Sequence, residues 1–120
     1  MKKKNLTTGK LGEEIAEKFL KSKNYQIIDK NWGNKFGEID LICRKNNIYV
    51  FVEVKTKVGD YFGTPENMFD QRKLFKVKKM ANAYLTKHGL INTQSRIDVV
   101  AITLDRNRNT KNINHYEAVY

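Results

Sequence analysis

Two carboxylates and a lysine fall on neighbouring strand-like segments of this sequence, where they could act on one phosphate. Asp40 lies in segment 38–44, and Glu53 and Lys55 lie in segment 48–56. Mg²⁺ prefers oxygen ligands and is usually held by only one or two carboxylates. The ion polarises a phosphoryl oxygen and acidifies a water molecule, while an adjacent lysine orients that water or stabilises charge on phosphorus. These residues therefore predict phosphodiester hydrolysis with Mg²⁺ or Mn²⁺, in which Asp40 and Glu53 bind the metal and all three residues are catalytic.

The turn between the two segments predicts which residues face each other. The Asn-Asn dipeptide 46–47 suits the left-handed dihedral angles of a two-residue type I′ turn. In the register that follows, Asp40 faces Glu53, and Glu38 faces Lys55. Directly opposed side chains have Cβ atoms roughly 4.5–5.5 Å apart, and like charges there destabilise the pair. The two carboxylates therefore require a proton, a neighbouring cation or a metal ion.

The other face of this ribbon is predicted to be apolar, which supports the register, because a shift by one residue would exchange the two faces. The alternative to a site is a solvated polar face that carries a Glu38–Lys55 ion pair. Large apolar residues share the charged face, however, as at the mouth of a cleft. The apolar face consists of Ile39, Leu41, Cys43, Val50, Val52 and Val54, and the large apolar residues beside the charges are Ile42, Tyr49 and Phe51.

A third carboxylate is predicted on a helix near the start of the chain. Apolar residues recur at helical spacing up to about Ser22, with Thr8 as the expected cap. Glu13 lies at the edge of the buried stripe, where it could face the sheet and act as a fourth catalytic residue and a third metal ligand. The alternative is that Glu13 only stabilises the helix by interacting with its dipole, as acidic residues in a first turn do.

The remaining pattern predicts one α/β domain over residues 1–120, with helices packed on a sheet and a flexible, basic end at 1–7. A second helix is expected over 66–87, closed by Gly89. Strands are expected at 25–30, 38–44, 48–56 and 96–104 with a last one at 113–120, and loops at 31–37 and 57–65.

Composition narrows the function classes. The 23 Lys and Arg residues against 13 Asp and Glu give a net charge of +10. A small domain this basic usually binds a polyanion, most often nucleic acid, although excess charge also aids solubility alone. The single cysteine, Cys43, excludes an internal disulfide and a zinc cluster. No apolar run approaches the ~20 residues that span a bilayer, so we expect a cytoplasmic protein without a membrane role.

Two further features suit a nucleic-acid ligand. The second predicted helix presents cations that could contact phosphates without reading sequence, although a charged helix face is often merely solvated. In the loop 57–65, Tyr61 and Phe62 either stack on an unpaired base or cover the core. The candidate nucleic-acid-binding cations are Arg72, Lys73, Lys76 and Lys79.

An ordered series of motifs extends over residues 9–104, nearly the whole domain. It comprises Gly12-Glu13, Asn31-Trp32, Gly37-Glu38-Ile39-Asp40-Leu41-Ile42, Val50-Phe51-Val52-Glu53-Val54-Lys55-Thr56 and Arg96-Ile97-Asp98-Val99-Val100. With this series the chain resembles the YraN-like family of small bacterial proteins. That family is similar to the restriction-endonuclease-like superfamily, and closest in layout to archaeal Holliday-junction resolvases.

The resemblance implies a mixed central sheet flanked by helices and a site that cuts DNA. In the superfamily, an Asp followed by Glu-x-Lys on the adjacent strand binds a divalent metal, helped by a Glu on the first helix. Carried over, this implies Asp40, Glu53 and Lys55 as the core, with Glu13 as the helix acid. The resolvase likeness also implies a homodimer that places two sites on two strands.

We therefore expect a metal-dependent nuclease that acts on DNA, with branched or structured DNA as the preferred form. The alternative is a basic nucleic-acid-binding protein that retains the nuclease fold without cutting. A third hypothesis is a nuclease directed at RNA.

Overall fold

The computed structural model describes residues 6–59 and 70–120 and contains two helices and five strands in this part of the chain. All five strands form one sheet in the order β1-β2-β3-β4-β5. β3 and β4 are parallel, whereas the other neighbours are antiparallel. In chain order the elements are α1 (Thr8–Ser22), β1 (Gln26–Asn34), β2 (Gly37–Lys45), β3 (Ile48–Val58), α2 (Gln71–Lys87), β4 (Ser95–Leu104) and β5 (Thr110–Tyr116).

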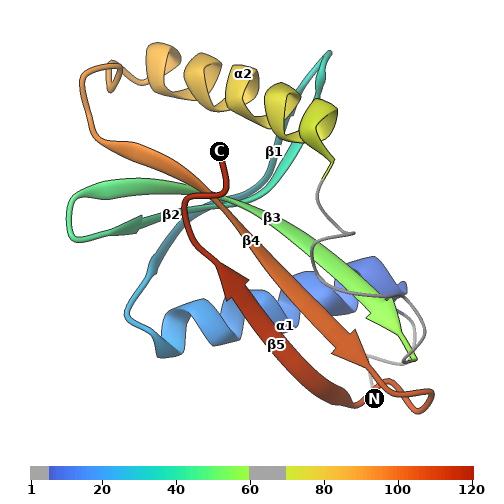
Figure 1. Ribbon diagram of the computed structural model, residues 1–120. Helices are drawn as coiled ribbons and strands as arrows, with labels where there is room; N and C mark the ends of the chain where they lie inside the picture. The colour runs from blue at the N-terminus through green and yellow to red at the C-terminus, as the bar shows by residue number, and fades with distance from the viewer. Residues whose placement is uncertain (1–5, 60–69) are drawn as a thin grey trace.

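The two helices cover opposite faces of the sheet (Figure 1). α2 belongs to the crossover that parallel neighbours such as β3 and β4 require. The predicted α/β fold, a mixed sheet flanked by helices, is thereby confirmed. Within the described residues, neither helix is both long and apolar enough to cross a bilayer.

Each face of the sheet carries its own apolar core. The core under α1 includes Leu11, Ala16, Leu20, Leu41, Cys43, Val50, Val52, Val100 and Ile102. The core under α2 includes Ile39, Ile42, Phe51, Leu74, Val77, Met80, Tyr84, Ile97 and Val99. The alternation along β3 and β4 supplies both cores, because successive side chains of a strand point to opposite faces.

α1 begins one residue after its cap. Thr7, rather than the expected Thr8, is the N-cap, and its hydroxyl accepts a hydrogen bond from the Lys10 N–H at 3.1 Å. Leu6 packs against the core under α1. Residues 6 and 7 of the predicted flexible end are therefore fixed to the fold, and residues 1–5 lie outside the described part.

α2 starts later than the sequence pattern predicts. Asp70 is extended (φ −121°, ψ 116°), and its carboxylate caps the helix by accepting the Arg72 N–H at 2.9 Å. The expected start at residue 66 and the loop aromatics Tyr61 and Phe62 lie outside the described residues. The end is as predicted, since Gly89 follows the helix in the left-handed region (φ 68°).

β1 is longer than expected, because it continues through residues predicted to be loop. It runs to Asn34, and only residues 35–36 separate it from β2. Asparagine and glycine disfavour strands, which explains the prediction. Packing outweighs this preference, since Trp32 pairs with Ile39 across the ladder and meets the Tyr84 ring edge to face, with centroids 5.3 Å apart.

Candidate active site

The β2–β3 hairpin has the predicted turn and the predicted register along most of its length. Asn46 and Asn47 both have positive φ (52° and 67°), as a type I′ turn requires. Pairing then continues from the turn as far as Leu41 opposite Val52. The local pattern therefore aligned the two strands correctly up to the residues proposed to do chemistry.

Beyond Leu41 the two strands stop pairing, and Asp40 lies at the point of separation. Its Oδ2 accepts a hydrogen bond from the Val54 backbone N–H at 2.7 Å. A side chain thus satisfies a main-chain donor that a continued ladder would have used. The expected Asp40–Glu53 pair is not part of the ladder, and the separation leaves the carboxylate of Asp40 between two strands.

The alternation of β2 also changes at Asp40. Ile39, predicted on the same face as Leu41, is fully buried in the core under α2 instead. The β2–β3 ladder ends before Glu38 would face Lys55, and Glu38 is exposed. Both of these predicted placements are therefore wrong, because they assumed a regular ladder through residue 38.

Asp40 and Glu53 are nevertheless electrostatic neighbours. Burial, followed by the negative charges of Glu53 and Glu13, raises the pKa of Asp40 to about 7, against the opposing effects of the hydrogen bond from Val54 and the positive charge of Lys73. Glu53 is only 3% exposed. Two carboxylates close together and largely out of water favour a bound cation.

Two lysines provide positive charge next to these carboxylates. Lys73, from the first turn of α2, forms an ion pair with Glu53 Oε2, and the Lys55 Nζ lies 3.8 Å from the same oxygen. Burial and the adjacent Lys73 ammonium lower the pKa of Lys55. Burial opposes the charge on Lys73, but the hydrogen bond and charge of Glu53 raise the pKa of Lys73 above its ordinary value. Lys73, predicted on an outer phosphate-binding ridge, therefore reaches the candidate site.

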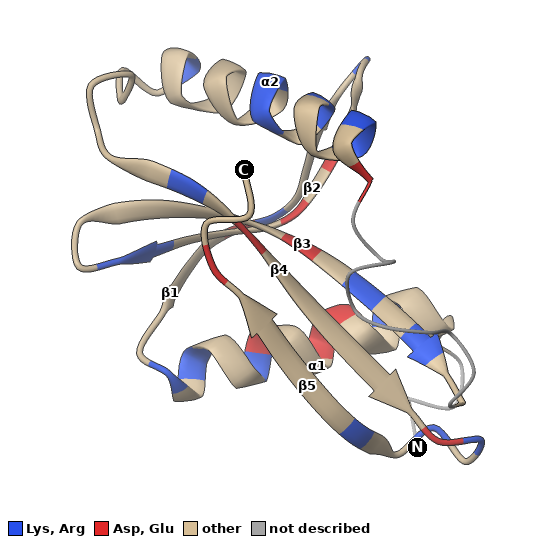
Figure 2. Ribbon diagram, viewed as in Figure 1, with Lys and Arg blue, Asp and Glu red and all other residues tan. Residues whose placement is uncertain are grey.

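Figure 2 shows this arrangement at the level of the fold, with acidic segments of β2 and β3 facing the basic first half of α2. The other predicted phosphate-binding cations, Arg72, Lys76 and Lys79, line a groove on the outer face of α2. The candidate site and the basic helix face are therefore adjacent.

Glu13 reaches the neighbourhood of the site because α1 lies very close to β3. A Cβ added to Gly12 would lie 1.8 Å from the Thr56 Oγ1, so only glycine allows this approach. The Glu13 Oε1 accepts a hydrogen bond from the Asn31 side-chain amide at 3.1 Å and lies 3.5 Å from the Lys10 Nζ. Its charge acts on Asp40, while its Oε1 is held by Asn31 and Lys10.

The donor set fits a hard cation such as Mg²⁺, although with fewer ligands than predicted. Asp40 and Glu53 offer carboxylate oxygens, and Mg²⁺ commonly takes one or two carboxylates and keeps several waters. Among the described residues, no three His, Cys, Asp or Glu side chains form a group that could hold a metal ion. The structure thus associates Asp40 with Glu53 but does not bring Glu13 to them as a third ligand.

Asn31 was not identified as a functional residue by sequence reasoning. It has positive φ (50°) and holds Glu13 through its side-chain amide. The sequence marks it only as part of the Asn31-Trp32 motif, and no spacing rule connects a residue in β1 with one in α1. Its contact depends on how the helix packs on the sheet.

A second buried charged group lies on the α1 side of β4. Asp98 is fully buried and accepts hydrogen bonds from the Arg96 Nε at 3.0 Å and the Ala118 N–H at 3.0 Å, and lies 2.7 Å from the His115 Nε2. Burial opposes its charge, but these partners lower the pKa of Asp98. Arg96 lies two residues before Asp98 on the same face of β4, whereas His115 comes from the neighbouring strand β5. This group fastens the C-terminal segment to the sheet.

Comparison with known proteins covers the whole of the candidate site. The model described as "Uncharacterised protein family UPF0102" matches residues 12–102. A UPF0102 protein of Clostridium beijerinckii is 35% identical over 120 residues, covering 100% of this chain and 98% of the relative. A UPF0102 protein of Caldanaerobacter subterraneus subsp. tengcongensis is 40% identical over 117 residues, or 96% of each chain. A third, of Syntrophus aciditrophicus, is 40% identical over 83% of this chain and 79% of its own length. Glu13, Asp40, Glu53 and Lys55 all lie within the matched range, and β5 lies beyond it.

Proposed function

This chain belongs to the uncharacterised protein family UPF0102, and we propose that it is a metal-dependent nuclease that hydrolyses DNA phosphodiester bonds. The description of the family names no reaction, so the proposal rests on the site itself. One observation carries the proposal. Asp40 and the buried Glu53 lie close enough for their charges to interact, beside Lys55, where β2 and β3 separate. A buried pair of carboxylates with a lysine is a costly arrangement for a purely structural role, and such perturbed groups cluster at functional sites.

Asp40 and Glu53 are the residues that would hold a Mg²⁺ or Mn²⁺ ion. Such an ion supplies Lewis acidity to a phosphoryl oxygen and acidity to a water molecule. Glu13 adds negative potential at Asp40 and so favours a cation there, and the amide of Asn31 keeps the Glu13 carboxylate directed toward the sheet. The site thus provides two ligands and one supporting charge.

Lys55 is the residue we assign to the reacting phosphate. Its side chain is 24% exposed, so part of it is accessible to a ligand from solution. From this position it orients the attacking water or stabilises negative charge that develops on phosphorus. Lys73 pairs with Glu53 and would be available to a substrate phosphate if a divalent cation were bound to Glu53.

The finer parts of the proposal rest on the motif resemblance. They are membership of the restriction-endonuclease-like superfamily, action on branched or structured DNA as in resolvases, and a homodimer with two sites in a cytoplasmic protein. The basic first half of α2, which adjoins Glu53 through Lys73, suits a DNA backbone because phosphate contacts position a duplex without reading its sequence.

A second candidate function is supported by a different observation. Glu53 is already paired with Lys73, and Glu13 with Asn31 and Lys10. A protein that binds nucleic acid and does not cut it would be stable with these pairs intact. This alternative predicts that removing Asp40 or Glu53 leaves DNA affinity unchanged and that no product forms.

The test is a cleavage panel. Labelled duplex, single-stranded, flap and four-way-junction DNA, with RNA versions of each, are incubated with Mg²⁺, Mn²⁺ or EDTA. We expect metal-dependent cutting of at least one DNA substrate by the wild type, reduced by several orders of magnitude in Asp40→Asn and Glu53→Gln. Binding without product on every substrate would support the non-catalytic alternative, and cutting of RNA alone would support the RNA-directed one.

A further inference from the structure

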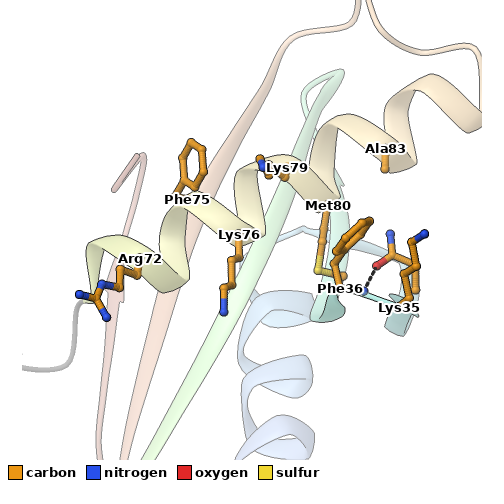
Figure 3. Close-up of a pocket in the computed structure, with 9 residues that line it drawn as sticks. Lys35, Phe36, Arg72, Phe75, Lys76, Lys79, Met80 and Ala83 are labelled. Carbon is orange, nitrogen blue, oxygen red and sulfur yellow. Dashed lines mark hydrogen bonds between the residues drawn. The ribbon is translucent and has the colours of Figure 1, made fainter.

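A groove separates the outer face of α2 from the turn that joins β1 to β2 (Figure 3). Its volume is about 650 Å³. The residues on its α2 side recur at helical spacing and therefore share one face of the helix. The described lining residues are Asn34, Lys35 and Phe36 from the turn region, and Arg72, Phe75, Lys76, Lys79, Met80 and Ala83 from α2.

Two aromatic rings in this groove are exposed to solvent. Phe36 is 69% exposed and Phe75 is 50% exposed. Neither ring is needed to close the core under α2, which Met80 and its neighbours fill. An exposed apolar patch of this kind marks an interaction site when it is framed by polar residues.

Each exposed ring has a lysine ammonium group over it. The Lys35 Nζ lies 5.3 Å from the centroid of the Phe36 ring, and the Lys79 Nζ lies 5.1 Å from the centroid of the Phe75 ring. Arg72 adds a further charge, and none of the described lining residues is acidic. The groove thus combines flat apolar surfaces with cations at short range, the combination that binds single-stranded nucleic acid through base stacking and phosphate pairing.

A hydrogen bond and close packing hold the turn against α2. Asn34 Oδ1 accepts the Phe36 N–H at 2.8 Å and holds the turn. Gly37 has φ 143°, and a Cβ there would lie 3.4 Å from the Met80 sulfur, so the turn packs closely on α2. Because Met80 is itself buried, the two walls have a fixed relation to each other.

The groove lies about one helical turn of α2 from the lysine that reaches the proposed active site. Lys73, which pairs with Glu53, and Lys76, which lines the groove, are three residues apart on α2. That spacing corresponds to a rise of about 4.5 Å along the helix. A strand whose reacting phosphate lies at Lys55 and Lys73 could therefore extend into the groove within one nucleotide or two.

We propose that this groove binds an unpaired stretch of a DNA strand, with bases stacked on Phe36 and Phe75 and phosphates paired with Lys35, Lys76 and Lys79. The binding itself follows from the groove alone. Its consequence for substrate choice rests on the proposed nuclease function: the preferred substrate carries a single-stranded segment next to the bond that is cut.

The test separates bases from phosphates. In EDTA, so that no cleavage occurs, binding of a fluorescent single-stranded oligodeoxynucleotide is measured by anisotropy beside an abasic oligonucleotide of equal length. We expect Phe36→Ala and Phe75→Ala each to weaken binding of the base-bearing strand roughly five- to hundredfold, the range for loss of one stacked base, and to leave the abasic strand unaffected. A 2-aminopurine base should be quenched on binding to the wild type and not to the double variant.

Matched variants make the result specific. Phe36→Tyr should bind like the wild type because it keeps the ring, and Ile91→Ala, which removes a side chain that is 56% exposed elsewhere, should have no effect. Lys79→Ala should weaken both oligonucleotides and reduce the salt dependence of binding by about one counterion.

Several outcomes would overturn the inference. These are equal loss on base-bearing and abasic strands, no measurable binding of either, tighter binding of single-stranded RNA than of DNA, or a dimer that Phe36→Ala dissociates, since a second copy would then fill the groove. Cleavage that persists in the phenylalanine variants with unchanged affinity would refute the groove and leave the nuclease proposal standing. Base stacking in the groove without any cleavage would refute the nuclease proposal and leave the groove proposal standing.

Discussion

The close approach of α1 to β3 makes Gly12 the most sensitive position in the helix that carries Glu13. In Gly12→Ala the new methyl group would lie 1.8 Å from the Thr56 Oγ1 and 2.9 Å from its Cβ, far inside van der Waals contact. Overpacking of this kind destabilises a domain by about 1–3 kcal/mol, and occasionally more. We expect a loss at the upper end of that range, because the threonine hydroxyl is held between a helix and a central strand.

The same contact predicts an unusual double-mutant cycle. The Thr56 hydroxyl is buried and has no hydrogen-bond partner among the described residues, so Thr56→Ala should be nearly neutral or stabilising. Removing the hydroxyl should also relieve the shortest contact of the Gly12→Ala methyl group, the one at 1.8 Å, while the contact with the Thr56 Cβ at 2.9 Å stays. The two changes together should therefore cost less than their sum, with a coupling energy of about 1–2 kcal/mol.

Urea denaturation at fixed pH measures these free energies of unfolding. Gly9→Ala is the matched control, since it lies in the same helix with nothing within 4 Å of its added Cβ, and it should be neutral or stabilising by up to about 1 kcal/mol. A Gly12→Ala variant as stable as the wild type, or a strictly additive cycle, would refute the packing of α1 on which the position of Glu13 depends.

Three further predictions concern the charged groups. Asp98→Asn should lower the free energy of unfolding at pH 7 by about 3–5 kcal/mol, as loss of one partner of a buried ion pair does. Because the folded pKa of Asp98 is lowered, the difference from the wild type should shrink as the pH falls below about 4. A pH-independent difference in urea titrations would contradict this prediction. Because the pKa of Asp40 is raised to about 7, the free energy of unfolding of the protein without added metal should fall as the pH rises from about 4 to 7. Asp40→Asn should remove this pH dependence. An equal dependence in the two proteins would show that Asp40 is not the group responsible. Added Mg²⁺ should raise the melting temperature of the wild type at pH 8, where Asp40 is ionised, and not that of Glu53→Gln, whereas equal shifts in a thermal denaturation assay would place the ion elsewhere.

Local patterns predicted the hairpin well. The Asn46-Asn47 turn and the pairing up to Leu41 depend on residues close together in sequence, and the structure confirms both. The separation of β2 from β3 was not predictable in this way. It depends on Asp40 accepting the Val54 N–H, a side-chain contact that no alternation of apolar and polar residues encodes.

Contacts between distant elements were harder to anticipate. Lys73 was expected on the solvent side of α2, and it reaches Glu53 because of how the helix crosses the sheet. Asn31 holds Glu13 although β1 was expected to end before it. In both cases the residue type was visible in the sequence, and tertiary packing decided its partner.

The most direct test of the proposed nuclease compares Lys55→Ala with Lys87→Ala on the DNA substrate that the wild type cuts best in Mg²⁺. Both changes remove one positive charge, but Lys87 lies at the far end of α2 and is exposed. We expect product formation by Lys87→Ala at the wild-type rate and no detectable product with Lys55→Ala, while both variants remain folded. Equal product from the two variants, or none from the wild type on any substrate, would contradict the assignment of Asp40, Glu53 and Lys55 as a catalytic site.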